Sequence, residues 1–395
     1  MNIDNLQRKN KKNSNGLSTM KHKCLLCFGT LILLVSIYFT GCIDTETSHH
    51  TPNISSWLAK KDAIIASEKP YDMVMTGWFT PEEALQLKSQ NPNVLLLAGL
   101  SLNWIWENEE WIAFLETVAS YDHDGPLKLT EQMYLKTPQG EKCAFGWQSD
   151  EWGHEEIYAM DPRDPDWVEL ITSFYFNVLD QPQHDGVIVD MLSEKQWWCS
   201  EAISDEEWFS ATQTIMAEIQ QYNTNEKLII CNSGCYYEDI DLYHDFFDGF
   251  LLENFMGDQC GSTYEEGMHA AETGKIVIYA IDTDDTNVQD MNKMRLGLTL
   301  SLLYDTTYFT YDVGPRDHGD AWWFTEYDAD IGGAEGVYYQ QDTAYFRSYE
   351  HGLVVSAPYS AVTVSFTQPH TDVSTGITGI EFVVPEGDGR IFLIK

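Results

Sequence analysis

Short apolar runs recur along the chain from Tyr71 onwards, and most are followed by a polar or glycine-containing turn and then by a stretch with helical spacing. This alternation is typical of repeated βα units around a parallel sheet. The near-continuous hydrophobicity of the runs indicates strands that are buried on both faces. The pattern predicts eight strands: Tyr71–Phe79, Asn93–Leu100, Pro126–Tyr134, Asp185–Asp190, Lys227–Asn232, Phe247–Asn254, Lys275–Asp282 and Tyr308–Asp312.

Helical stretches lie between these runs. One is predicted to start at Pro81, and another to follow the segment Met160–Trp167 and end near Leu179, with Pro165 in its first turn. Eight strands with intervening helices over about 270 residues match the size and period of a (β/α)₈ TIM barrel. We therefore expect an α/β chain whose main domain, residues 57–335, is such a barrel.

The last part of the chain has a different pattern. Between residues 336 and 395, Pro and Gly separate short alternating runs: Gly352–Val355, Ala361–Phe366, Gly379–Val384 and Arg390–Ile394. Alternation of this kind predicts a small C-terminal antiparallel β-domain after the barrel.

The N-terminal segment resembles a secretory signal. Basic residues precede a short apolar run, Leu25–Phe39, and Gly41-Cys42 follows, as in the lipobox of prokaryotic lipoproteins, in which the Cys is lipidated. We expect residues 1–41 to be a signal peptide, Cys42 to be the lipidation site and residues 42–56 to include a flexible tether. The alternatives are an uncleaved anchor or an ordinary signal cut nearby. All three place the remainder outside the cytoplasm, and the lipid anchor would hold it at the cell surface.

Composition narrows the classes of partner. The 395 residues include 43% hydrophobic residues and 13 Trp, which suit a globular protein. The sequence has 23 Lys and Arg residues and 62 Asp and Glu residues, which gives a formal net charge of −39. Such a charge repels phosphate backbones, so we expect no nucleic-acid partner, and we expect no membrane contact except through the anchor. A solvated acidic exterior is the favoured interpretation.

The cysteines after the anchor are odd in number. One or two disulfides are expected in an oxidising compartment, with the pairing left open, and the spacing does not favour zinc. These residues are Cys143, Cys199, Cys231, Cys235 and Cys260.

Carboxylates close several of the predicted strands. Asp190 and Glu253 end runs that open with Asp-Gly at the same offset, so both are expected at the C-terminal mouth of the barrel, where barrel enzymes place their active sites. Two carboxyl groups at such a mouth, one protonated and one ionised, are what glycosidic hydrolysis requires. Asp282 and Asp312 close two further strands. For each acid, the alternative is that it caps the next helix or binds loop amides.

Aromatic residues cluster at or soon after the same strand ends, where flat rings suit sugars. For any single Trp, packing in the core is an equally good interpretation. The grouped residues are Trp78, Trp104, Trp106, Trp147, Trp152, Trp197, Trp198, Trp322 and Trp323, and further mouth candidates are Asn103, Asn232, Asn254, Tyr279 and Arg316. From these and the strand-end acids, the predicted substrate-binding residues are Trp78, Trp104, Asn232, Asn254, Asp282, Asp312 and Trp198.

Several segments also resemble a known group. From about Tyr71 to its end, the chain is similar to the glycosyl hydrolase families of (β/α)₈ barrels that are related to the endo-α-1,4-polygalactosaminidase-like group. The resemblance rests on four segments: His184–Met191, Phe247–Phe255, Met160–Trp167 and Phe346–Val355 with its closing strand. It implies that Asp190 and Glu253 are the catalytic pair and that a C-terminal β-domain follows the barrel.

The sequence therefore predicts a surface-anchored glycoside hydrolase that cleaves O-glycosidic bonds of an extracellular polysaccharide or oligosaccharide, without cofactor or metal. Glu253 is provisionally the general acid, and Asp190 the nucleophile or general base. One alternative is a non-catalytic carbohydrate-binding surface lipoprotein, which would keep the aromatic cleft. Another is a metal-dependent sugar deacetylase, which needs an Asp/His ligand set at strand ends that the sequence does not offer.

Overall fold

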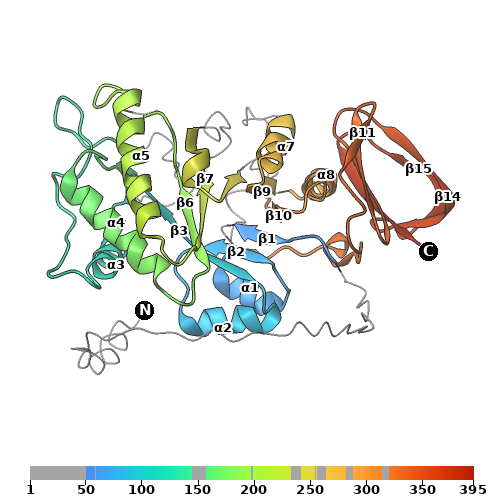
Figure 1. Cartoon of the computed structure of the whole chain (residues 1–395), viewed down its shortest axis with the longest axis horizontal. Coiled ribbons are helices and arrows are strands. Elements are labelled where there is room, and N and C mark those ends of the chain that lie inside the picture. The colour runs from blue at the N-terminus through green and yellow to red at the C-terminus, as the bar shows by residue number, and fades with distance from the viewer. Residues whose placement is uncertain are drawn as a thin grey trace, which may run out of the picture. The chain divides into compact units, whose positions relative to one another are not determined.

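The main body is a barrel of eight parallel strands (Figure 1). The computed structural model describes residues 50–57, 59–144, 157–196, 199–232, 242–253, 255, 264–281, 288–313 and 320–395. All neighbouring strands in the order of the sheet pair in parallel. In that order the strands are β1 (Ser55–Trp57), β2 (Met73–Thr76), β3 (Leu95–Ser101), β6 (Gly186–Asp190), β7 (Leu228–Asn232), β8 (Gly249–Leu252), β9 (Ile276–Ile281) and β10 (Thr307–Tyr311).

The sheet closes where β1 meets β10. A parallel bridge joins Ile54 to Phe309, and the Ser55 hydroxyl donates to the Phe309 carbonyl at 3.1 Å. Alternate residues of the strands point inward and fill the barrel, so it has a packed core rather than a pore. The buried members of this interior cluster are Met73, Met75, Leu97, Ile188, Ile230, Leu251, Ile278 and Ala280.

The predicted barrel is confirmed, with one strand exchanged. The segment Pro126–Tyr134 forms no strand, because its amides bind elsewhere: Leu127 N–H donates to the Ser120 hydroxyl and Leu129 N–H to the Glu116 carboxylate. The first barrel strand is instead β1, which the expected tether overlaps at Ser55 and Ser56. Only three residues long and opened by two serines, β1 has no apolar run that a sequence pattern could detect.

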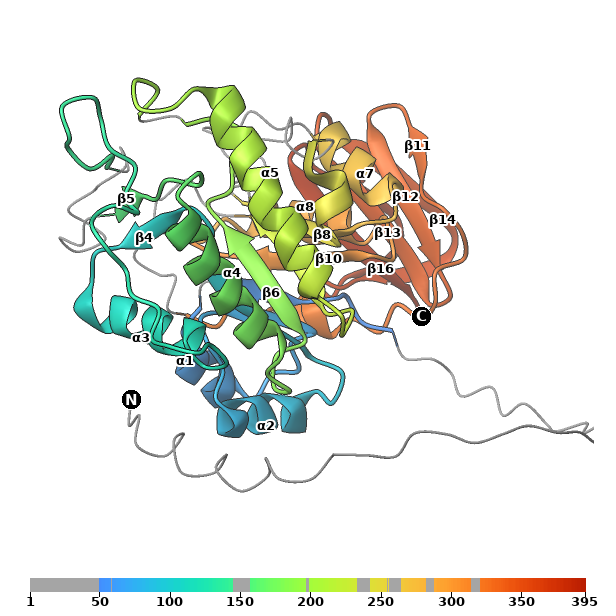
Figure 2. The same cartoon turned by 60° about the vertical axis from the view of Figure 1, so that its left-hand side comes forward.

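Helices cover the outside of the barrel, and several start as the sequence predicts. The helix predicted at Pro81 begins there, with Thr80 as its N-cap in a capping box with Glu83. The helix that ends at Leu179 begins at Pro165, behind an Asp164 cap. In Figure 2, α4 and α5 flank β6. Within the described residues, the α-helices are α1 (Lys61–Ser67), α2 (Pro81–Gln90), α3 (Glu109–Ala119), α4 (Pro165–Leu179), α5 (Asp205–Tyr222), α7 (Tyr264–Glu272) and α8 (Met291–Ser301), and the short 3₁₀ segments are η2 (His244–Phe246) and η3 (Thr325–Asp328).

A long excursion separates β3 from β6. It contains a two-stranded antiparallel pair, β4 (Trp104–Trp106) with β5 (Ile157–Ala159), besides α3 and α4. A disulfide joins Cys143 in this excursion to Cys199, which follows β6. Cys231 is buried, while Cys235 and Cys260 lie outside the described residues. The disulfide therefore ties the excursion to the loop after Asp190.

The C-terminal antiparallel sheet is present as predicted, and it has two strands that the sequence pattern did not single out, β11 and β12. Its order is β11-β12-β13-β16-β14-β15, with β11 (Tyr339–Gln341), β12 (Ala344–Tyr349), β13 (Gly352–Ala357), β14 (Val362–Asp372), β15 (Thr378–Val384) and β16 (Asp388–Ile394).

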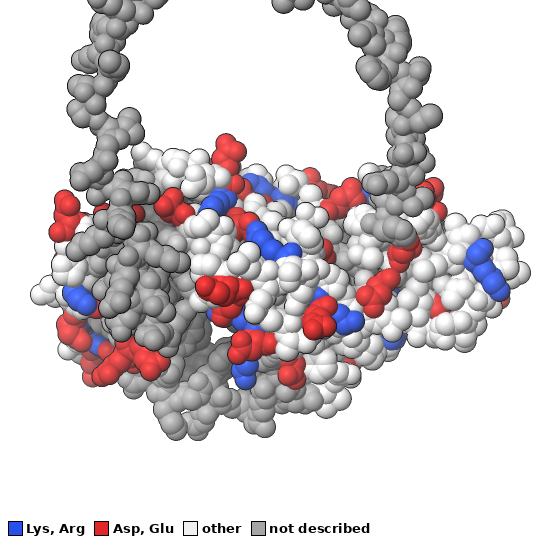
Figure 3. Space-filling model, turned by 90° about the horizontal axis from the view of Figure 1, so that it is seen from below, with Lys and Arg blue, Asp and Glu red and all other residues white. Residues whose placement is uncertain are grey.

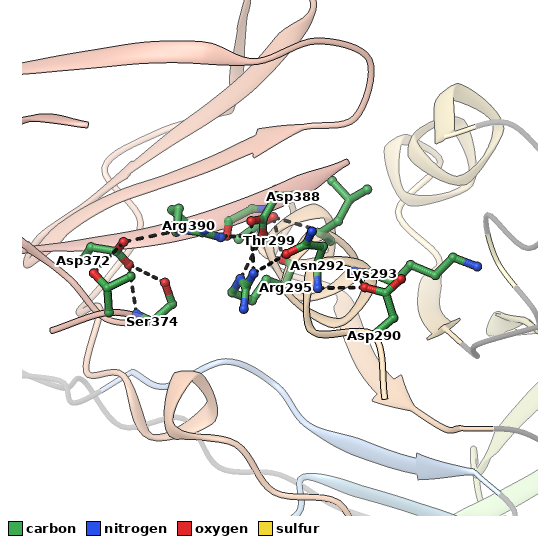
Figure 4. A network of polar contacts seen from close by, with 12 residues as sticks. Asp290, Asn292, Lys293, Arg295, Thr299, Asp372, Ser374, Asp388 and Arg390 are labelled. Atoms are coloured by element: carbon green, nitrogen blue, oxygen red, sulfur yellow. Dashed lines mark hydrogen bonds and ion pairs between the residues drawn. The ribbon is translucent and has the colours of Figure 1, made fainter. Parts of the chain in front are cut away.

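An ionic network holds this sheet against α8 (Figure 4). The Arg295 guanidinium of α8 binds both oxygens of Asp388 at 2.9 and 3.0 Å. Arg390 lies 2.5 Å from the same carboxylate and 3.4 Å from Asp372. Asp388 is only 1% exposed, so its charge depends on these two arginines.

Acidic and basic side chains are interspersed on the face shown in Figure 3. Some of the acids are paired, as Glu83 is with Lys61 and Asp185 with Lys88. In the part of the chain that the structure describes, no helix is both long and apolar enough to cross a membrane.

Candidate active site

Three polar side chains replace the apolar interior at the C-terminal ends of adjacent strands. Asp190, Asn232 and Glu253 each come two residues after an inward-facing interior residue, namely Ile188, Ile230 and Leu251. Since side chains alternate along a strand, these three also point inward, at the mouth of the barrel. The pairing of Ile188 with Ile230 brings Asp190 level with Asn232.

The Asn232 amide joins the two carboxylates. Its Nδ2 donates to Asp190 Oδ1 at 2.7 Å and to Glu253 Oε2 at 2.9 Å. Because both bonds share one nitrogen, the two carboxylate oxygens are no further apart than the sum of these lengths, about 5.6 Å. Asn232 is 1% exposed, so the bridging amide is held rigidly inside the mouth. The structure thus brings together three residues that the sequence predicted for the site.

Trp57 is a fourth member that the sequence analysis did not single out. Its indole Nε1 donates to Glu253 Oε1 at 3.1 Å, so both oxygens of Glu253 accept N–H groups. The residue ends β1, three strands away from β8 in the barrel order. Only a Trp after a short serine-containing segment marks it in the sequence, and that signal is too weak to assign a site residue.

The environment of Asp190 favours its neutral form. Burial raises the pKa of this carboxyl and the negative charge of Glu253 raises it further, while hydrogen bonds from Met191 N–H and Asn232 lower it, giving a pKa of about 7. Met191 N–H reaches Oδ1 at 2.8 Å because Met191 takes up a left-handed backbone conformation with φ 54°, which is strained for a residue with a side chain. No described residue donates to the second oxygen, Oδ2.

The predicted aromatic cleft is only partly supported by the positions of its residues. Trp78 points outward and packs edge-to-face on His184 and Phe114, beside a small apolar pocket between the strands and the helices α3 and α4. Trp104 is 4% exposed and packs near Trp208. The Trp104 ring is therefore a core residue with little surface for a sugar, whereas Trp78 is partly buried against the core.

Asp312 lies on the opposite side of the mouth. It follows β10, accepts a hydrogen bond from Val313 N–H at 2.7 Å and lines a small pocket beside Trp57. Trp322 lines the same pocket. Asn103 is buried and donates to Thr212 of α5 at 2.8 Å.

The remaining candidates are not all described. Tyr279 is buried in the layer between strands and helices and packs against Phe255. Trp323 donates to Asp328 at 3.0 Å, and Trp106 is half-buried in β4. The predicted residues that lie outside the described residues are Cys42, Trp147, Trp152, Trp197, Trp198, Asn254, Asp282 and Arg316.

No group of three or more His, Cys, Asp or Glu side chains with the arrangement of a metal site occurs among the described residues. What the mouth does offer is a pair of carboxyl groups within reach of one another, one with a raised pKa and one held by two N–H donors. Such a pair can exchange a proton with a bound molecule and supply an anionic oxygen beside it.

The sequence matches the family model described as hypothetical glycosyl hydrolase family 15 over residues 102–353, which is more than half of the chain. No curated protein matches the sequence.

Three solved structures illustrate the more distant likenesses. The glycoside hydrolase domain of PelA from Pseudomonas aeruginosa is 12% identical, with 67% of this chain and 96% of that chain covered and a TM-score of 0.43. Ega3 of Aspergillus fumigatus, in a complex with galactosamine, is 10% identical, with 67% and 92% covered and a TM-score of 0.41. An α-amylase from Malbranchea cinnamomea is 10% identical, with 84% and 87% covered and a TM-score of 0.47. Likenesses of this size carry no argument about the chemistry of this chain.

Proposed function

The chain belongs to hypothetical glycosyl hydrolase family 15, and on that premise we propose that it hydrolyses O-glycosidic bonds of an extracellular polysaccharide with Asp190 and Glu253 as its two carboxyl groups. Membership makes the protein a glycoside hydrolase with a carbohydrate substrate. The observation that supports these two residues is the Asn232 amide, which binds both carboxylates at the barrel mouth. A two-carboxylate site requires this proximity.

The spacing favours hydrolysis with retention of the anomeric configuration. Retaining glycosidases hold their carboxyl groups about 5 to 5.5 Å apart, whereas inverting enzymes leave about 6.5 to 9.5 Å for a water molecule. The upper limit of about 5.6 Å between Asp190 Oδ1 and Glu253 Oε2 fits the first class. One carboxyl group would then attack the sugar, and the other would protonate the leaving oxygen. Proton NMR of the first product anomer tests this, and an inverted product would exclude it.

The unliganded site suggests where the shared proton is held. Asp190, with its raised pKa, is the member that favours protonation, whereas Glu253 accepts two N–H groups. If Glu253 is the general acid, as the sequence analysis expects, the proton must move from Asp190 to Glu253 when a sugar binds. Azide rescue shows which of the two carboxyl groups is the nucleophile and which is the acid. Replacement of the nucleophile by Gly yields a glycosyl azide of inverted configuration, and replacement of the acid yields one of retained configuration.

Surface anchoring is the second part of the proposal. The basic and apolar segment before Gly41-Cys42 supports export and lipidation at Cys42. In cells, the Cys42→Ser variant should leave the membrane fraction and appear in the medium. An unchanged distribution would refute lipidation at this residue.

The main experiment measures new reducing ends released from neutral, acidic and amino-sugar polysaccharides. Asp190→Asn and Glu253→Gln should each lower the rate by several orders of magnitude. Asp185→Asn is a matched control, because Asp185 immediately precedes the same strand but binds Lys88 at the opposite end of the barrel. Full activity of both site variants would remove these residues from the chemistry. Sugar binding without any product from the parent protein would instead favour the non-catalytic binding lipoprotein.

A further inference from the structure

We propose that the outer edge of β15 binds the same edge of a second copy of this chain, so that the two C-terminal sheets join into one continuous antiparallel sheet. This inference goes beyond the reaction at the barrel mouth and does not depend on it. β15 is the last strand in the order of its sheet, and its neighbour there is β14. In Figure 1, α8 lies on one side of this sheet, and β14 and β15 lie on the other.

The outer edge of β15 presents backbone groups that the sheet does not use. The Ile377 carbonyl accepts the Asp372 N–H of β14 at 2.9 Å, so the backbone polar groups of Ile377 face β14. Successive residues of a strand direct these groups to opposite sides, so those of Thr378, Ile380 and Phe382 point away from β14. Within the described part of the chain, they form no backbone hydrogen bond outside the β14 pairing. Such a row of N–H and C=O groups is a template for a further strand.

This edge lacks the usual protection against strand pairing. Soluble proteins commonly keep an edge strand short or place Lys or Pro on it. At the other edge of the same sheet, β11 has only three residues. β15 has seven residues and contains neither Lys nor Pro. The longer edge is therefore the one that can accept another strand.

Three exposed apolar side chains along this edge are spaced symmetrically. Ile377, Ile380 and Val383 are 61%, 56% and 63% exposed, and Ile380 lies three residues from each of the other two. Two antiparallel copies centred on Ile380 place this residue opposite itself and place Ile377 opposite Val383 of the second copy. The edge is thus complementary to itself, as a twofold contact between identical chains requires.

The distribution of charge also favours a second copy. The whole chain has a net charge of −39, but the hairpin of β14 and β15 contains only two acidic residues, Asp372 and Glu381, and no Lys or Arg. Asp372 is buried and lies 3.4 Å from Arg390. The register centred on Ile380 sets Glu381 opposite Gly379 of the second copy, so no like charges meet. Repulsion between two acidic chains is therefore small at this edge.

The first test traps the dimer with Ile380→Cys in the full chain under mild oxidation, followed by non-reducing electrophoresis. In the proposed register the two Cα atoms at position 380 lie about 5.5 Å apart, within the range of about 4.4 to 6.8 Å that a disulfide spans. Most of this variant should therefore run as a covalent dimer. The parent chain measures any linkage through its native cysteines.

Ser365→Cys is the matched control for trapping. Ser365 is exposed on β14, so both β15 strands would separate it from its copy by more than about 10 Å. It should remain monomeric. Equal yields of dimer from the two variants, or none from Ile380→Cys, would overturn the proposal. Linkage of Ile380→Cys to a different protein would assign the edge to another partner and would also overturn it.

The second test measures the dimer dissociation constant of the full chain in detergent by analytical ultracentrifugation. Ile380→Lys sets two positive charges opposite each other and should raise the Kd at least about 10-fold. Gly379→Lys should instead lower it about threefold or more, because each introduced lysine faces Glu381 of the other copy. A Cβ at position 379 meets no atom closer than 3.4 Å, so the strand accommodates this change.

Val337→Lys is the matched control for charge, since Val337 is 87% exposed and lies outside β15. It reduces the net negative charge equally and should leave the Kd unchanged. Thermal unfolding verifies that each variant is folded. A parent that stays monomeric up to about 500 μM would overturn the proposal, because that concentration exceeds the Kd of even a weak specific contact. So would equal effects of Ile380→Lys and Val337→Lys.

Discussion

Replacing Asp190 by Asn should stabilise the folded protein at alkaline pH and leave its stability nearly unchanged at acidic pH. The folded site raises the pKa of this carboxyl from 3.8 to about 7, first through burial and then through the charge of Glu253. A carboxyl group whose pKa is higher in the folded than in the unfolded state stabilises the fold while it is protonated. That contribution is fully present below about pH 4 and is lost as the pH rises through about 7.

The magnitude follows from the shift. About three pKa units, at about 1.4 kcal/mol each, amount to a ceiling of about 4 kcal/mol for the free energy of unfolding lost between pH 4 and pH 8. Asp190 is partly exposed at the mouth, so solvent screening reduces this value, and we expect about 1 to 3 kcal/mol. Asparagine has nearly the same shape and carries no charge, so the variant avoids the cost of a buried negative charge at every pH.

The assay is urea unfolding followed by tryptophan fluorescence at pH values from 4 to 8. The difference in the free energy of unfolding between variant and parent, taken at each pH, gives the contribution of Asp190 without that of the other acidic groups. Glu386→Gln is the matched control, because it removes one charge from an exposed turn and should give a difference that is flat with pH. A flat difference for Asp190→Asn, or destabilisation at pH 8, would refute the conclusion that the site holds this carboxylate at an energetic cost.

Four further results are expected. Asp388→Ala should lower the free energy of unfolding by about 3 to 5 kcal/mol, measured by chemical denaturation, because it leaves two arginines without their buried partner. Gly389→Ala should also destabilise, since a Cβ there would lie 2.0 Å from the Thr299 hydroxyl and 2.6 Å from the Arg295 carbonyl of α8; an unchanged melting temperature would contradict this close approach. Breaking the disulfide with Cys143→Ser should cost up to about 4 kcal/mol for a loop of 56 residues, as measured against the parent under oxidising conditions. Asn232→Leu should lower kcat by at least about 100-fold while the protein remains folded by circular dichroism, because both carboxylates lose their common donor.

Much of the barrel can be predicted from local pattern alone. Runs such as Gly186–Asp190 and Leu228–Asn232 are apolar, short and closed by a polar residue, which is sufficient to identify buried parallel strands and their mouth ends. The alternation of side chains then places Asp190 and Glu253 on the inner face. The same argument fails for Ser55–Trp57, because a three-residue strand opened by two serines carries no apolar run. It also fails for Pro126–Tyr134, whose apolar residues pack against the barrel core although its amides bind helix side chains.

The sequence by itself determined the repeated βα architecture, the antiparallel C-terminal sheet and the pair of strand-end acids, because each depends on the order of apolar and polar residues within a few positions. Only the tertiary structure decided which side chains meet. The closing of β1 onto β10 brings Trp57 into contact with Glu253, 196 residues further along the chain. Trp78, which follows β2, points outward and packs on His184. Such contacts depend on the stagger and closure of the whole barrel, which no local segment contains.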